Sequence, residues 1–344
     1  LPGYQVAVAD MSKDETKILV RTYSDRSLGA YYFFDRESGE FTKLVDVSPW
    51  LDESEMASMK PVQFTSRDGL TIRGYLTLPA GAKAENLPVV VNPHGGPWAR
   101  DAWGFNPEVQ FLANRGYAVF QPNFRGSTGY GKEFWQASFK EWGGKMQDDI
   151  TDGVQWVIES GIADADAIAI VGWSYGGYAA LAGMTFTPDL YACGLDLWGI
   201  SNYFTFYDSI PPYWKPFLEE INERWGDAVA DRQQMHDTSP VFHVERIKAP
   251  LLIAQSANDT RVRRSQSEQM IEELKLMKQG NINFVRTAHY PNDPRWYELC
   301  SQFGIMVLDE ANVETHQLSY HKRVLPGDKP EWMHACVDRM QRMV

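Results

Sequence analysis

Ser174 lies in a Gly-Trp-Ser-Tyr-Gly stretch that fits the G-x-S-x-G pattern of a serine nucleophile. The apolar residues 167–171 before it predict a buried strand, and the small residues 176–184 after it predict a helix. A serine on so tight a turn needs glycine neighbours, because a Cβ atom there would clash with the backbone. Such a turn exposes the serine hydroxyl. This setting favours a nucleophile over the alternative, a purely structural turn.

Two backbone N–H groups are expected to stabilise the negative oxygen that forms when a serine attacks a carbonyl group. One is the N–H of Tyr175, at the start of the predicted helix. The other is expected in NPHGGPWAR, residues 92–100, which follow an apolar strand and contain two adjacent glycines. We expect Gly96 to be this second oxyanion donor. The alternative interpretation of the segment is a plain Gly-Pro turn.

Asp259 is the candidate for the acid that orients a catalytic histidine. It lies in SANDTRV, residues 256–262, directly after another apolar stretch. A carboxylate at the end of a later strand suits the chain order Ser, Asp, His of this kind of hydrolase. The alternative is an Asn-Asp turn with a solvated charge.

The elements that must position these residues predict an α/β fold. Short apolar stretches alternate with helix-like segments, among them 147–161 and 266–277, which indicates a doubly wound, mainly parallel sheet covered on both faces. The predicted strands are 88–93, 117–123, 167–172 and 250–256. Before them, residues 31–45 predict a hairpin with a glycine-containing turn, and a second hairpin is expected around Asp68-Gly69. Residues 1–48 are too few to bury a core alone, so we expect them to belong to a larger β unit.

Composition narrows the class of protein. The chain has 344 residues, of which 44% are hydrophobic and 23% charged, as in a folded soluble protein. Its net charge of −12 argues against nucleic acid or an anionic membrane as the main partner. Its three cysteines are too far apart for a disulfide framework or a zinc site. We therefore expect no cofactor and no metal, and we favour a cytoplasmic location; the oligomeric state is not predicted.

Several motifs together resemble the prolyl oligopeptidase family of serine peptidases, with the acylaminoacyl-peptidase and dipeptidyl-peptidase-like branch closest. They include HGGPWARDAWGFNPEVQFLANRGYAVFQPNFRGSTGYGKEFW, WGGKMQDDITDGVQWVIESG, IVGWSYGGYAA and SPVFHVERIKAPLLIAQSANDTRV. The resemblance implies an α/β-hydrolase domain over 56–275, preceded in 1–55 by a remnant β-propeller blade and a connector. It also implies short peptides as substrates, with Arg261 contacting them near the cleaved bond.

After the QSEQM helix the chain departs from this family, because no Gly-His-Gly loop follows to supply the base. The passages RTAHYPNDPRWYELC and VLDEANVETH, within 276–344, resemble the TIM barrel of family two β-galactosidases. In that family the residue matching His289 lines the sugar site, and those matching Glu314 and His316 help to hold magnesium. The two carboxylates that glycoside hydrolysis requires lie further along in that family, so we expect no glycosidase activity.

The chain therefore resembles a junction of two unrelated genes near residues 273–281. A deliberate fusion, a recombined gene and an assembly error would all give this pattern. The segments INFVRTAH, PRWYELCSQFG and IMVLDEA predict a βαβ unit that replaces the last strand and helix of the hydrolase sheet. In that register His289 follows a strand and becomes the candidate base. The alternative is a histidine that never meets Ser174.

The other histidines are given lesser roles. His94 is expected to shape the oxyanion loop, His236 and His243 are expected to be structural, and the remaining three lie in the tail. The leading hypothesis is thus a serine peptidase acting on short peptides or blocked N-termini. The alternatives are a catalytically inactive chimeric product that retains the serine elbow and, as the weakest, a sugar- or magnesium-binding remnant.

Overall fold

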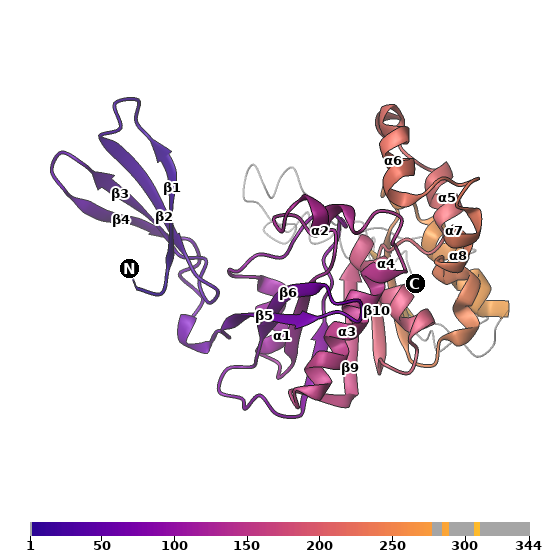
Figure 1. Cartoon of the computed structure of the whole chain (residues 1–344). Helices are drawn as coiled ribbons and strands as arrows, with labels where there is room; N and C mark the ends of the chain where they lie inside the picture. Colours follow the sequence, from indigo (N-terminus) through magenta and orange to yellow (C-terminus); the bar gives the residue numbers. More distant parts are fainter. Residues whose placement is uncertain (1, 277–283, 289–305, 310–344) are drawn as a thin grey trace, which may run out of the picture. The chain divides into compact units, whose positions relative to one another are not determined.

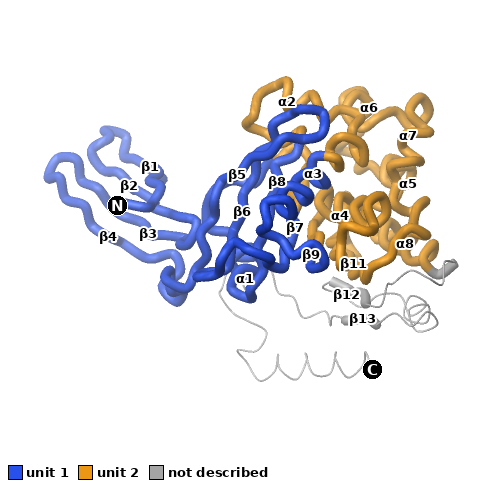
Figure 2. Tube along the Cα trace, turned by 60° about the horizontal axis from the view of Figure 1, so that its bottom comes forward, with its two compact units in different colours: residues 1–92, 100–124, 149–168 blue, residues 93–99, 125–148, 169–344 orange. Residues whose placement is uncertain are grey.

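The computed structural model describes residues 2–276, 284–288 and 306–309 (Figure 1). The chain divides into two compact units, shown in Figure 2. The first unit comprises residues 1–92, 100–124 and 149–168, and the second comprises 93–99, 125–148 and 169–344. Within the part of the chain that the structure describes, no helix is both long and apolar enough to cross a membrane.

The chain begins with a four-stranded antiparallel sheet in the order β1-β2-β3-β4 (Figure 1). Its strands are β1 (Gln5–Met11), β2 (Lys17–Tyr23), β3 (Ala30–Asp35) and β4 (Phe41–Asp46). The predicted hairpin is confirmed by the pairing of β3 with β4, where the rings of Tyr32 and Phe41 stack 4.8 Å apart. This meander has the form expected of a propeller blade.

A nine-stranded mixed sheet follows, in the order β13-β12-β11-β10-β9-β7-β8-β6-β5. Its strands are β5 (Met59–Thr65), β6 (Thr71–Thr77), β7 (Leu87–Val91), β8 (Ala118–Asn123), β9 (Ala163–Trp173), β10 (Cys193–Leu197), β11 (Leu251–Ser256), β12 (Phe284–Ala288) and β13 (Met306–Asp309). The β5–β6 hairpin is antiparallel and so is the β6–β8 pair. The pairs β7–β8, β9–β10, β10–β11, β11–β12 and β12–β13 are parallel. The predicted doubly wound α/β fold is thus confirmed.

The helices alternate with these strands, as the sequence pattern requires. They are α1 (Pro107–Ala113), α2 (Lys132–Gln136), α3 (Lys145–Glu159), α4 (Tyr175–Phe186), α5 (Tyr203–Asp208), α6 (Leu218–Trp225), α7 (Arg232–Asp237) and α8 (Ser265–Leu276). Three short 3₁₀ helices join them: η1 (Glu53–Glu55), η2 (Pro212–Phe217) and η3 (Pro240–Arg246). The helices predicted over 147–161 and 266–277 correspond to α3 and α8.

Each unit has its own core. In the first, β7 and β8 contribute side chains such as Val91 and Phe120, which are fully buried. In the second, α4 is buried on all sides from Tyr175 to Thr185. A helix enclosed in this way cannot be amphipathic, which explains its run of glycine, alanine and leucine.

Two parts of the fold differ from or extend the prediction. Strand β10 was not predicted, although it pairs with both β9 and β11. Strands β12 and β13 coincide with the expected INFVRTAH and IMVLDEA strands and extend the sheet in parallel beyond β11. The helix expected between them lies outside the described residues.

Candidate active site

Ser174 occupies the turn between β9 and α4, at the N-cap position of the helix. Its backbone has φ 57° and ψ −120°, a conformation that non-glycine residues rarely adopt and that costs on the order of 1–3 kcal/mol. Two hydrogen bonds hold it there: its N–H donates to the Leu197 carbonyl at 2.9 Å, and its carbonyl accepts from Tyr178 N–H at 3.0 Å. The strained backbone turns the half-buried serine out of the strand.

The glycines that flank Ser174 are required by close backbone contacts. A Cβ atom on Gly172 would lie 2.2 Å from the carbonyl oxygen of Gly176. A Cβ on Gly176 would lie 2.2 Å from the carbonyl oxygen of Pro93. Neither contact can be relieved by rotating a side chain. The structure thus gives the physical reason for the glycine pattern in the sequence.

The glycine loop that contains the candidate oxyanion donor lies against this turn. A Cβ on Gly95 would lie 3.0 Å from the Trp173 carbonyl oxygen and 3.5 Å from the Ser174 Cβ. Gly96 is the next residue, exposed and with φ 133°, a region that favours glycine. The proximity of Gly95 to Ser174 was not predicted from the sequence, and the role of Gly96 as the second oxyanion donor stays a prediction.

His94 fixes the start of the same loop. It is buried, with 8% of its surface exposed, and its Nδ1 lies 2.8 Å from the Gly95 carbonyl oxygen. Its Nε2 lies 2.8 Å from the Ser127 hydroxyl. Burial lowers the pKa of His94 to about 4, so the ring is neutral at pH 7. A neutral ring that donates through Nδ1 to Gly95 accepts through Nε2 from Ser127.

The side chain of Tyr175 points away from solvent and is completely buried. Its ring packs 4.8 Å from that of Trp142, and its hydroxyl lies 3.7 Å from the sulfur of Met146. Tyr178, one turn later, donates from its hydroxyl to the Thr238 carbonyl at 2.9 Å. These contacts anchor the start of α4, whose first N–H groups have no partner within the helix.

Asp259 lies on the loop after β11, at the same edge of the sheet as Ser174. The register pairs Trp173 with Leu197, and Leu197 with Ala254, and all three strands are parallel. The Asp259 Oδ1 accepts from the N–H groups of Arg261 at 2.8 Å and Val262 at 2.9 Å. Its Oδ2 has no hydrogen-bond partner among the described residues. One carboxylate oxygen therefore shapes the loop.

Arg261 is exposed on this loop. The candidate base, His289, lies outside the described residues, as do Glu314 and His316. The structure describes the strand before it: β12 pairs with β11 in parallel, with Ser256 opposite Ala288. His236 and His243 belong to α7 and η3, and the His236 ring stacks on Phe242 at 4.4 Å.

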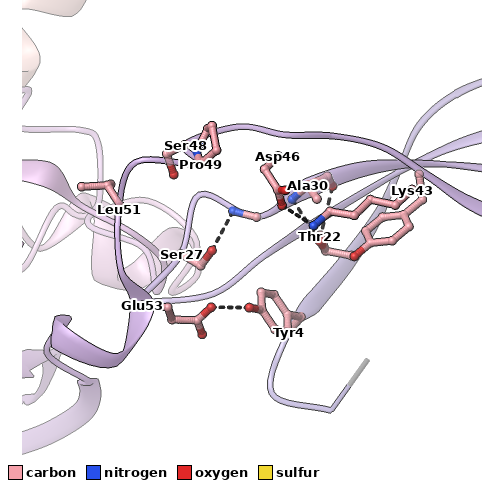
Figure 3. A pocket seen from close by; sticks show the side chains of 12 residues that line it. Tyr4, Thr22, Ser27, Ala30, Lys43, Asp46, Ser48, Pro49, Leu51 and Glu53 are labelled. Atoms are coloured by element: carbon pink, nitrogen blue, oxygen red, sulfur yellow. Dashed lines mark hydrogen bonds and ion pairs between the residues drawn. The ribbon is translucent and has the colours of Figure 1, made fainter.

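A pocket of about 260 Å³ lies in the first unit, beside the four-stranded sheet (Figure 3). Four of the polar side chains that line it form two pairs. Tyr4 donates to Glu53, and Lys43 forms an ion pair with Asp46 at 2.5 Å. We assign no ligand to this pocket.

A parallel strand, a serine at positive φ and a buried helix follow one another as in the nucleophile elbow of α/β-hydrolases. Residues 103–293 match the prolyl oligopeptidase family, and the chain belongs to that family. It is 45% identical over 278 residues to dipeptidyl aminopeptidase BIII of Pseudoxanthomonas mexicana, covering 78% of this chain and 40% of that protein. The chain thus spans less than half the length of this relative.

A solved structure supports the same assignment. The acylaminoacyl peptidase of Pyrococcus horikoshii superposes with a TM-score of 0.67 at 25% identity, over 91% of this chain and 46% of that one. The described four-stranded sheet and the mostly parallel sheet both fit a peptidase of this fold.

The C-terminal segment matches another family. Residues 255–344 match the TIM barrel domain of glycosyl hydrolases family 2. The β-galactosidase of Vibrio vulnificus is 54% identical over 77 residues, covering 22% of this chain and 7% of that protein. The two family matches overlap over residues 255–293, a range that contains both Asp259 and His289.

Proposed function

We propose that this chain is a serine peptidase that cleaves short peptides through an acyl-enzyme. The observation that carries the proposal is the backbone of Ser174, held at φ 57° between a parallel strand and a buried helix. Positive φ at a serine is costly, and such strain is typical of residues whose side chain must be presented for chemistry. The peptidase relatives named above give the substrate class.

In the proposed mechanism the Ser174 hydroxyl attacks the scissile carbonyl and the N–H groups of Tyr175 and Gly96 stabilise the oxyanion. His289 accepts the serine proton and later passes it to the leaving amine. Asp259 orients that histidine through its Oδ2, the oxygen that none of the described residues binds. Arg261, exposed on the same loop, contacts the peptide near the cleaved bond.

The second candidate is an inactive chain that keeps the elbow but lacks a working base. The observation that favours it is the overlap of two family matches at the point where the base is needed. The proposed division is a blade and connector (1–55), a hydrolase domain (56–275) and a β-galactosidase-like tail (276–344). The overlap over 255–293 supports the second boundary, and the separate four-stranded sheet β1–β4 supports the first.

A fluorophosphonate probe separates the two candidates. We expect labelling of the full chain, its loss in Ser174→Ala, and a loss of at least 100-fold in labelling rate in His289→Ala. His236→Ala is the matched control, because this exposed histidine belongs to α7 and has no role in the proposed mechanism. Labelling that is indifferent to His289→Ala would remove that residue from the mechanism. Absence of labelling in the parent chain would favour the inactive candidate.

A further inference from the structure

Strand β10 ends in a buried carboxyl group that the catalytic scheme does not use. Asp196 is 1% exposed, and its Oδ1 accepts from the N–H of Gly199 at 2.7 Å. Burial raises the pKa of Asp196 to about 7, and the hydrogen bond from Gly199 opposes this with a smaller effect. Burying a carboxyl group is costly, and among the described residues no cation pairs with Asp196, so we ask what the carboxyl does there.

The turn that Asp196 closes is strained and touches the serine. Trp198, inside the turn, has φ 44°, a positive value at a non-glycine residue, as at Ser174. Leu197, just before it, provides the carbonyl that accepts from Ser174 N–H. The Trp198 N–H donates to Ala254 of β11 at 2.7 Å. The turn thus joins the serine to the strand that leads to the candidate acid.

The carboxyl group also lies under the first turn of α4. Cβ atoms built on Gly177 and on Gly199 would each lie 2.4 Å from the Asp196 Oδ1. A Cβ on Gly199 would also lie 2.5 Å from the carbonyl carbon of Gly177. The helix start, the carboxyl and the 197–199 turn are therefore in direct contact, with no side chain between them.

We propose that Asp196 is a positioning residue for the nucleophile: by closing the 197–199 turn it holds the Leu197 carbonyl where it fixes Ser174. The hydrogen bond from Gly199 needs an acceptor at this place, and either an acid or an amide provides one. A residue without an acceptor leaves Trp198 free to relax from positive φ, and the carbonyl then moves away from Ser174 N–H. The catalytic part of this inference rests on the proposed function, whereas the structural part does not.

Hydrogen exchange of the full chain tests the structural part. In Asp196→Ala we expect the amides of residues 173–178 to exchange at least 10-fold faster, while those of 179–186 keep their parent rates. Asp196→Asn should restore the slow exchange. Thr185→Val is the matched control, because it removes a buried hydroxyl from the far end of α4. If Asp196→Ala does not fold, Asp196→Val, which suits a strand but has no acceptor for the Gly199 N–H, should show the same local effect.

Peptide hydrolysis tests the catalytic part. We expect kcat to fall about 10-fold in Asp196→Ala, with KM within two-fold of the parent and kcat restored within three-fold by Asp196→Asn. Unchanged exchange over 173–178, or equal loss of protection along all of α4, would overturn the proposal. If the parent chain has no Ser174-dependent activity, the proposed function fails, and the exchange measurement still decides the role of Asp196.

Discussion

The turn after β9 and the loop after β11 lie at the same edge of one sheet, yet they are held in different ways. Ser174 is fixed from outside its own turn, by the Leu197 carbonyl and by the glycine loop that contains Gly95. The Asp259 loop is held by hydrogen bonds from its own backbone to the carboxylate and by the Gln255 side chain of β11, which donates to the Val262 carbonyl at 2.9 Å. Arg261 within the loop is exposed. The candidate nucleophile is therefore positioned by strands and loops distant in the sequence, whereas the candidate acid is positioned by its own loop and the strand before it.

The largest loss of Ser174 reactivity is expected from adding a methyl group next to the turn after β9. In Gly176→Ala the new Cβ would lie 2.2 Å from the Pro93 carbonyl oxygen, which only a backbone movement can relieve. We expect no measurable fluorophosphonate labelling of Ser174. Gly144→Ala is the control, because its nearest neighbour, at 2.8 Å, is the flexible end of Glu141. Equal labelling of the two variants would show that the elbow is not rigid.

Replacing the candidate acid tests the second region, the loop after β11. Asp259→Asn keeps Oδ1 for the two backbone N–H groups of its loop but presents an amide to the base. If the triad operates, we expect kcat to fall about 10³–10⁴-fold with the fold intact. Steady-state hydrolysis of a dipeptidyl anilide and circular dichroism would measure the two quantities. A fall of less than 10-fold would mean that Asp259 only shapes its loop.

The free energy of unfolding should depend on pH through His94, which lies in the glycine loop beside Ser174 and whose pKa falls from 6.5 to about 4 on folding. Between these values the unfolded chain binds a proton that the folded chain does not, so stability declines as the pH is lowered from 6.5 to 4. The contribution amounts to about 3 kcal/mol at most. In His94→Asn, which keeps a donor for the Gly95 carbonyl, urea titrations should show a shallower decline over this range. An identical slope in both proteins would contradict neutral burial.

The smallest effect is expected from Arg261→Ala, on the exposed loop. Its loss removes a substrate contact but not the backbone N–H that binds Asp259. We expect KM for a short peptide to rise about 10-fold, equivalent to about 1.4 kcal/mol, with kcat within three-fold of the parent. Arg263→Ala, an exposed arginine two residues later, is the control. An equal change in both variants would point to a general charge effect.

The turn at Ser174 could be predicted from the sequence, but strand β10 could not. The elbow was predictable because Gly172 and Gly176 encode backbone contacts that no other residue allows. Strand β10 was missed because Cys193–Leu197 is five residues long and includes both a glycine and Asp196, which are unfavourable in strands. It forms because parallel neighbours pair with it on both sides. Local propensity cannot reveal such tertiary support.

Finer features of the site depend on packing that a linear pattern does not contain. The adjacent residues Gly95 and Gly96 read alike in the sequence, and only the fold brings the first against Ser174. Asp259 was predictable as the residue that follows an apolar strand. The use of its Oδ1 to close its own loop was not, because that depends on the backbone of residues 259–262.

The pairing of β12 with β11 has a consequence for how such a chain can arise. The four residue steps from Leu252–Phe284 to Ser256–Ala288 are joined by main-chain hydrogen bonds, which are the same for every amino acid except proline. A strand with a different ancestry can therefore extend a parallel sheet without any matching of side chains in the hydrogen-bonding direction. The edge of strand β11 can therefore pair with strands of many different sequences. Recombination can thus exchange a whole segment at this edge while the architecture is kept.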